Sequence, residues 1–118
     1  MDIVVVEFEG GIDKFPRLIQ TVDGLLADGV KRLVLDLATL AFINSAALGY
    51  LIKTQQHVTE QGGKLALVRV QPAIRNILTV TSLTSMFPNF DTVEKAVAAL
   101  GGDAKGPQVK RRPLASKG

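Results

Sequence analysis

The sequence predicts an α/β fold with a mixed, mostly parallel sheet of about four strands and about four helices. Short runs of β-branched and other apolar residues alternate with longer segments in which apolar residues recur at helical spacing. Glycine or proline stands near most of the transitions between them. Strands that alternate with helices are typical of βαβ units, whose strands pair in parallel.

The expected strands are short and rich in apolar residues. The run at 33–37 is almost continuously apolar, as in strands that helices cover on both faces. Pro88 cannot donate to a ladder, so the segment around it is expected at a sheet edge. The four expected strands cover residues 3–8, 33–37, 65–70 and 86–90.

Two longer helices are expected in the first half of the chain. Asp13 is a suitable N-cap for the first helix, and Gly29 is well placed to end it. The second helix is expected over residues 45–61, with apolar side chains on one side and Gly62 after its end. Each helix therefore has one apolar face with which to cover the sheet.

Two shorter helices are expected in the second half. Pro72 opens the first of them, because proline is favoured at the first helical position. Asp91 with Glu94 resembles a capping box that starts the second. Between the two helices, Ser82 is expected to avoid the positive φ for which glycine is favoured.

The charge is unevenly distributed along the 118 residues. Residues 1–101 hold nine lysines and arginines against ten aspartates and glutamates, and we expect them to form one domain. Residues 102–118 hold five basic residues against one acidic residue, and we expect a basic, disordered tail. The run Lys110–Arg112 either contacts RNA, lipid or an acidic partner or is simply solvated.

Composition argues against several classes of protein. The chain has no cysteine and a single histidine, His57, so neither a metal site nor a metal-dependent centre is expected. It has no Gly-rich phosphate-binding motif and no nucleophile elbow, so we expect no enzyme and no cofactor. No apolar run approaches the roughly 20 residues of a membrane helix, and no basic leader opens the chain. A cytoplasmic protein without a nucleic-acid surface is expected.

Five short motifs occur along the chain in a recognisable order. They are Gly10-Gly11-Ile12-Asp13, Leu33-Val34-Leu35-Asp36-Leu37, Ile43-Asn44-Ser45-Ala46-Ala47-Leu48-Gly49, Gly62-Gly63-Lys64-Leu65 and Pro72-Ala73-Ile74-Arg75. Together they resemble STAS domains and, more closely, the bacterial anti-sigma factor antagonists. The resemblance runs from about Ile3 to Leu100.

The resemblance implies a binding protein in a partner-switching pathway of signal transduction. Members of the family bind an anti-sigma factor that is also a serine kinase of the histidine-kinase ATPase type, and this binding frees the sigma factor. Phosphorylation of a serine or threonine at the start of the second helix abolishes binding, and a serine phosphatase restores it. A phosphate adds roughly −1.5 to −2 charge, which disfavours a close-packed interface.

This sequence departs from the family pattern at the switch position. The pattern reads Asp-Ser-Ser/Thr-Gly-Leu-Gly, with Asn common at the first place, and its second hydroxyl residue is the usual phosphoacceptor. Here Ala46 stands at that position, and Ala47 replaces the following glycine. Ser45, one residue earlier, is therefore the phosphorylation candidate. Relatives often begin with a β-hairpin, of which this sequence contains one strand.

Each candidate site residue has a structural alternative. Ser45 is either a phosphoacceptor or an N-cap, and Asn44 is either a partner contact or a cap. Asp36 lies inside an apolar strand and is expected to support the switch loop by accepting backbone N–H bonds. Tyr50 is either an interface anchor or a half-buried helix residue. The expected partner-binding residues are Asn44, Ser45, Ala46, Leu48, Gly49 and Tyr50.

Two functions remain open. The first is an anti-sigma factor antagonist switched by phosphorylation at Ser45. The alternative, favoured by Ala46, is a non-phosphorylatable STAS adaptor or a scaffold subunit of a larger signalling or transport complex. A monomer or weak homodimer is expected for an antagonist, and a large homo-oligomer for a structural subunit.

Overall fold

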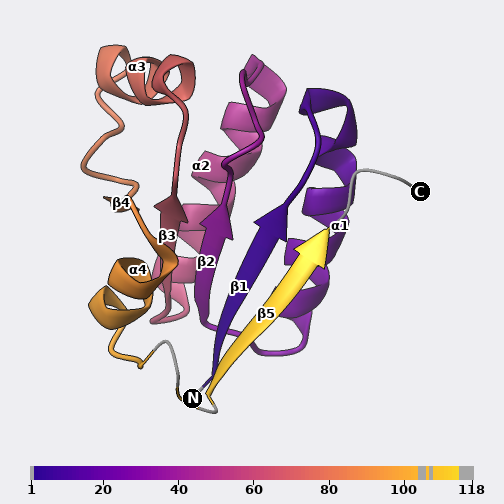
Figure 1. Ribbon diagram of the computed structural model, residues 1–118. Coiled ribbons are helices and arrows are strands. Elements are labelled where there is room, and N and C mark those ends of the chain that lie inside the picture. Colours follow the sequence, from indigo (N-terminus) through magenta and orange to yellow (C-terminus); the bar gives the residue numbers. More distant parts are fainter. Residues whose placement is uncertain (1, 104–105, 107, 115–118) are drawn as a thin grey trace.

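The fold is a parallel sheet with helices on both faces (Figure 1). The computed structural model describes residues 2–103, 106 and 108–114. Its strands are β1 (Ile3–Phe8), β2 (Arg32–Asp36), β3 (Lys64–Val68), β4 (Asn89–Phe90) and β5 (Val109–Leu114). They lie in the order β4-β3-β2-β1-β5, and every neighbouring pair is parallel. The predicted α/β fold with a mostly parallel sheet is confirmed.

The strand order explains where the helices lie. From β1 to β4 each strand is added on the same side of the previous one, and the connecting helices α1, α2 and α3 cover one face. The connection from β4 to β5 runs back across the sheet, and its helix α4 covers the other face. Both arrangements fit the right-handed crossover that parallel strands require. The helical bounds are η1 (Ile12–Lys14, a 3₁₀ turn), α1 (Phe15–Ala27), α2 (Ser45–Glu60), α3 (Pro72–Val80) and α4 (Val93–Ala99).

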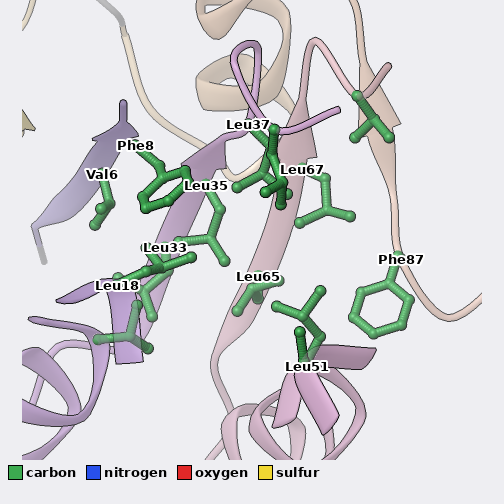
Figure 2. Close-up of a cluster of buried hydrophobic side chains, with 14 of the residues drawn as sticks. Val6, Phe8, Leu18, Leu33, Leu35, Leu37, Leu51, Leu65, Leu67 and Phe87 are labelled. Carbon is green, nitrogen blue, oxygen red and sulfur yellow. The ribbon is translucent and has the colours of Figure 1, made fainter. Parts of the chain in front are cut away.

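The three central strands are apolar on both faces. In Figure 2, side chains of β1, β2 and β3 such as Val6, Leu35 and Leu67 meet Leu18 of α1 and Leu51 of α2. The opposite face packs a smaller cluster against α4. This second cluster consists of Ile3, Val5, Val34, Ala66, Val68, Val93, Ala96, Val97 and Leu100. Within the described residues, no helix is long and apolar enough to cross a membrane.

β4 is shorter than the predicted strand 86–90. Its two residues pair with Leu67 and Val68, at the end of β3. In the segment that precedes β4, the side-chain amide of Gln55 lies between this segment and β3. It donates to the carbonyls of Leu65 (3.2 Å) and Met86 (2.6 Å). A side chain from α2 therefore takes the place of further ladder bonds. The predicted edge position of this segment is confirmed.

β5 lies inside the segment 102–118 that was expected to be a disordered tail. Val109–Leu114 pairs in parallel with β1, so the expectation is wrong for these residues. A strand adds its backbone hydrogen bonds to an existing edge, and this gain does not appear in local composition. Residues 104–105, 107 and 115–118 lie outside the described part of the chain.

Two predicted helix starts are displaced. Asp13 lies inside η1 and is not the N-cap of α1, because Pro16 in the first turn favours a start at Phe15. The N-cap of α4 is Thr92, whose Oγ1 accepts a hydrogen bond from the Lys95 amide at 3.1 Å, and not Asp91. Threonine is itself a favoured N-cap residue, because its hydroxyl oxygen accepts a bond from a free amide of the first turn.

Ser82 has φ +59°, which contradicts the expected negative φ. It follows α3, where its amide donates to the carbonyl of Thr79 at 3.1 Å and the next amide, of Leu83, donates to Leu78 at 2.8 Å. These bonds close the C-terminus of the helix and require a left-handed residue, although a Cβ makes that conformation unfavourable.

We expect the substitution Ser82→Gly to raise the free energy of unfolding by about 1 kcal/mol, because glycine removes the Cβ clash. The matched control is Ser85→Gly, at an exposed turn residue without positive φ, which we expect to leave stability unchanged or slightly lower. Urea denaturation of the three proteins measures the difference. Equal stabilities for the two variants would contradict the strain at Ser82.

Candidate functional site

The candidate site lies where the loop after β2 enters α2. Asn44 has extended backbone angles (φ −94°, ψ 174°), and its Oδ1 accepts a hydrogen bond from the Ala47 amide at 2.8 Å. Asn44 is therefore the N-cap, as one of its two alternatives predicted. Ser45 is the first helical residue, so the interpretation of Ser45 as the cap is wrong.

The capping by Asn44 leaves Ser45 available to solvent. Ser45 and Ala46 are both exposed, and the Ser45 hydroxyl has no hydrogen-bond partner among the described residues. The amides of these two residues belong to the first helical turn, which has no intrahelical acceptor. An exposed hydroxyl thus stands beside free N–H groups and the positive end of the helix dipole, a position that favours negative charge.

Buried apolar side chains hold the loop from Leu37 to Asn44 on the sheet. Leu37 and Leu40 are completely buried and Ile43 is 5% exposed. Phe42, which precedes Ile43, instead points outward and is 52% exposed. The loop is therefore fixed at three points and presents an aromatic ring two residues before the cap.

Two hydrogen-bonded side chains tie this loop to its neighbours. The Thr39 Oγ1 accepts a hydrogen bond from the Gly10 amide at 3.0 Å and lies 3.2 Å from the carbonyl of Phe8, at the end of β1. On the other side, Gln71 Nε2 donates to the carbonyl of Ala38 at 2.6 Å. Neither contact is visible in local sequence patterns, because the partners are 29 to 33 residues apart.

Asp36 supports the start of the same loop. Its carboxylate is 2% exposed, accepts a hydrogen bond from the Ala38 amide at 3.2 Å and forms an ion pair with Arg69. Hydrogen bonding and Coulomb attraction to Asp36 raise the pKa of the Arg69 guanidinium. Arg69 has φ +56°, an uncommon conformation for a residue with a Cβ. A buried carboxylate without a partner would be costly, so the pair fixes the ends of β2 and β3 together.

The remaining candidates lie on the next turn of α2. Leu48 packs against the core, whereas a Cβ at Gly49 would meet no atom within 4 Å. The Tyr50 hydroxyl donates to Asp23 Oδ1 in α1 at 2.7 Å, and its ring stands edge-on to Phe15 with centroids 6.1 Å apart. Burial and the hydrogen bond to Asp23 raise the pKa of Tyr50. Tyr50 is thus a half-buried helix residue that joins two helices, and its role as an interface anchor stays a prediction.

Of the residues that sequence reasoning proposed, Asn44, Ser45 and Ala46 form one exposed surface at the start of α2. We call these three residues together with Phe42 and Gly49 the α2 surface. Phe42 was missed as a candidate, although an aromatic residue in a loop beside the expected switch position was a usable signal. In the described part of the chain, no three histidine, aspartate or glutamate side chains are grouped as metal ligands.

Comparison with known proteins gives the family. The model of the STAS domain matches residues 2–96. An anti-sigma F factor antagonist of Paenibacillus polymyxa is 23% identical over 101 residues, covering 83% of this chain and 86% of that protein. The Bordetella bronchiseptica protein BtrV is 32% identical over 71 residues, which cover 60% of this chain and 61% of BtrV, less than two thirds of its length.

Solved structures agree with the fold. The crystal structure of an anti-sigma factor antagonist from Mycobacterium paratuberculosis superposes with a TM-score of 0.70 at 30% identity, covering 82% of this chain and 86% of that chain. Membership of one family thus explains the order of the motifs, the parallel sheet and the loop before α2. The chain belongs to the STAS domain family.

Proposed function

We propose that this protein is an anti-sigma factor antagonist that binds an anti-sigma factor through the α2 surface. Its similarity to proteins named anti-sigma factor antagonists supports this role. We further propose that the partner is a serine kinase of the histidine-kinase ATPase type, and that Ser45 accepts its phosphate. A serine phosphatase would reverse the step, and the protein would act by binding, without catalysis of its own.

One observation carries the proposed switch: the Ser45 hydroxyl is exposed at the first position of α2, while Asn44 supplies the cap. A hydroxyl that is not needed for capping is modified without loss of the helix. A phosphate there meets favourable helix N–H groups, so the modified protein stays folded. The added charge instead acts on whatever surface faces Ser45.

The surroundings of Ser45 fit a close-packed protein contact. Phe42, three residues before Ser45, and Ala46, the next residue, are both exposed and apolar, and Gly49 has no side chain at its position in the second turn. Large aromatic residues are typical anchors of interfaces. A phosphate placed among such contacts would have to be desolvated, which disfavours binding.

Ala46 supports a second candidate function. It stands where the family pattern has its usual phosphoacceptor, so a constitutive adaptor or scaffold subunit that no kinase switches is the alternative. In that case the amount of protein alone would set its effect. The two functions differ in one measurable property, the transfer of phosphate to Ser45.

We expect Ser45→Asp to abolish capture of the partner from a lysate of the native cells, as identified by mass spectrometry. The same change should raise the free energy of unfolding slightly, by about 0.3–1 kcal/mol, because a carboxylate is favourable in the first helical turn. Ser45→Asn is the matched control, with a side chain of similar size and no charge. Recovery of the same kinase by all three proteins would contradict a charge-controlled interface.

Phosphate transfer is tested with the captured kinase and radiolabelled ATP. We expect the label on the wild-type chain and not on Ser45→Ala, because Ser45 has the exposed hydroxyl at the start of the helix. Ala46→Ser should create an additional acceptor at the neighbouring exposed position. Label on Ala46→Ser alone would favour the constitutive adaptor, with an intact docking surface that lacks its acceptor.

We expect Gly49→Ala to raise the free energy of unfolding by about 0.5–1 kcal/mol and to weaken partner capture. Alanine is the better helix former, and its methyl group has free space in the isolated protein. The matched control is Gly24→Ala in α1, where a Cβ also meets nothing within 4 Å. It should give the same stabilisation with normal capture. If both variants capture the partner equally, the second turn of α2 lies outside the interface.

A further inference from the structure

β5 is attached to the sheet by its backbone and its charges more than by apolar burial. The side chains of Lys110, Arg111, Arg112 and Pro113 are exposed, and only those at the two ends are partly buried. Val109 packs against the cluster under α4, and Leu114 against the cluster under α1. Elements with so few buried apolar contacts are those that open most easily. Figure 1 shows β5 beside β1 at the edge of the sheet.

The ladder between the two strands has a regular pattern. The amide of Ile3 donates to the carbonyl of Gln108, and the amide of Glu9 donates to the carbonyl of Leu114, each at 2.9 Å. Because backbone groups alternate along a strand, the amides of Val5 and Glu7 also point toward β5, while those of the even-numbered residues point toward β2. Hydrogen exchange of the odd-numbered amides of β1 thus reports on pairing with β5, and exchange of the even-numbered amides reports on pairing with β2.

The charges of the two partners are complementary. Arg111 lies opposite Val5 in the register, with Nη1 3.2 Å from Glu7 Oε2 in β1 and Nη2 3.9 Å from Glu94 Oε2 in α4. Two carboxylates from different elements therefore converge on one arginine. Arg112, the next residue, points to the other face of the sheet and forms no ion pair within the described residues.

The free side of β5 is closed to further strands. By the same alternation, the backbone of Pro113 faces away from β1, where a residue other than proline would present an N–H group. Proline and basic side chains are typical of edge strands that do not pair further. The surface that accepts a strand is therefore the edge of β1, and β5 fills it.

We propose that the edge of β1 is a binding site for an extended basic segment of a partner protein, and that Val109–Leu114 occupies it as a displaceable internal ligand. Such a segment would add to the sheet in parallel, by backbone hydrogen bonds. An arginine opposite Val5 would supply the charge that Glu7 and Glu94 recognise, and apolar residues at the two ends would take the places of Val109 and Leu114. This site is separate from the α2 surface and does not depend on the proposed function.

The first test weakens the internal ligand in the full-length chain. We expect Arg111→Glu to accelerate hydrogen exchange of the Val5, Glu7 and Glu9 amides by about tenfold or more, because β5 opens locally. The Val4, Val6 and Phe8 amides, which face β2, should keep their wild-type rates. Arg112→Glu changes the charge equally at the neighbouring residue and should have little effect. The double variant Glu7→Arg with Arg111→Glu should restore much of the protection.

The second test supplies the ligand in trans. The probe is a synthetic peptide with the sequence of residues 108–114, added to the Arg111→Glu chain, whose own strand no longer competes at high effective concentration. We expect saturable binding that restores protection at Val5, Glu7 and Glu9. The same peptide carrying Arg111→Glu should not bind.

Three results would overturn the proposal. Equal exchange in Arg111→Glu and Arg112→Glu would show that the charge pair does not hold the strand. Loss of protection at odd and even amides alike, in Arg111→Glu and in the milder Arg111→Gln, would make β5 an integral part of the sheet. Absence of peptide binding to a chain whose β5 has opened would mean that the edge recognises no extended basic segment.

Discussion

The parallel pairing of β1, β2 and β3 is the constraint on which the rest of the structure depends. Their backbone groups are removed from water and must be paired with each other, and the burial of side chains on both faces fixes the register between the strands. One row of that register runs from Val5 through Val34 to Ala66, and these side chains are apolar on the face that α4 covers. The neighbouring row lies on the other face and is apolar too. Both faces therefore need helices, and right-handed crossovers decide which helix covers which face.

The same constraint brings the candidate site together. Parallel strands end at one edge of the sheet, so the loops after β1, β2 and β3 meet there. Thr39 connects the second loop to the first, while Asp36 and Arg69 connect the second strand to the third. A loop that is already fixed loses little conformational freedom when a partner binds. This rigidity suits a surface whose binding would be controlled by charge at one hydroxyl.

The two edges of the sheet are protected in different ways. At β4 the ladder is short, and Gln55 satisfies the carbonyl of Leu65 in place of a strand. At β5 the ladder is long, but the strand carries basic side chains and a proline. An open edge invites pairing with other chains, and both devices prevent it. Only at the second edge does a strand with little apolar burial, β5, cover the continuous edge of another strand, β1.

Local patterns determined most of the fold. The periods of apolar residues located β1, β2 and β3 and the helices α1, α2 and α3, because burial on a strand or helix repeats at a spacing visible in the sequence. The ordered motifs around Asp36, Ser45 and Pro72 indicated the family, which the match to the STAS model confirmed. The place of the candidate site followed from the strand that precedes it and the helix that follows it.

Tertiary structure decided what depends on partners distant in the sequence. The choice of Asn44 over Ser45 as the N-cap depends on where the anchored loop enters α2. The positive φ of Ser82 depends on how α3 ends before the amide of Leu83 donates back to Leu78. Arg111 and Glu7, which form an ion pair, are 104 positions apart in the sequence. Arg69 and Asp36, which form another, are 33 positions apart. Periodicity reports which residues are buried, because burial has a repeat. It does not report which charged or backbone groups meet across the sheet, because those contacts arise only when the register brings the elements together.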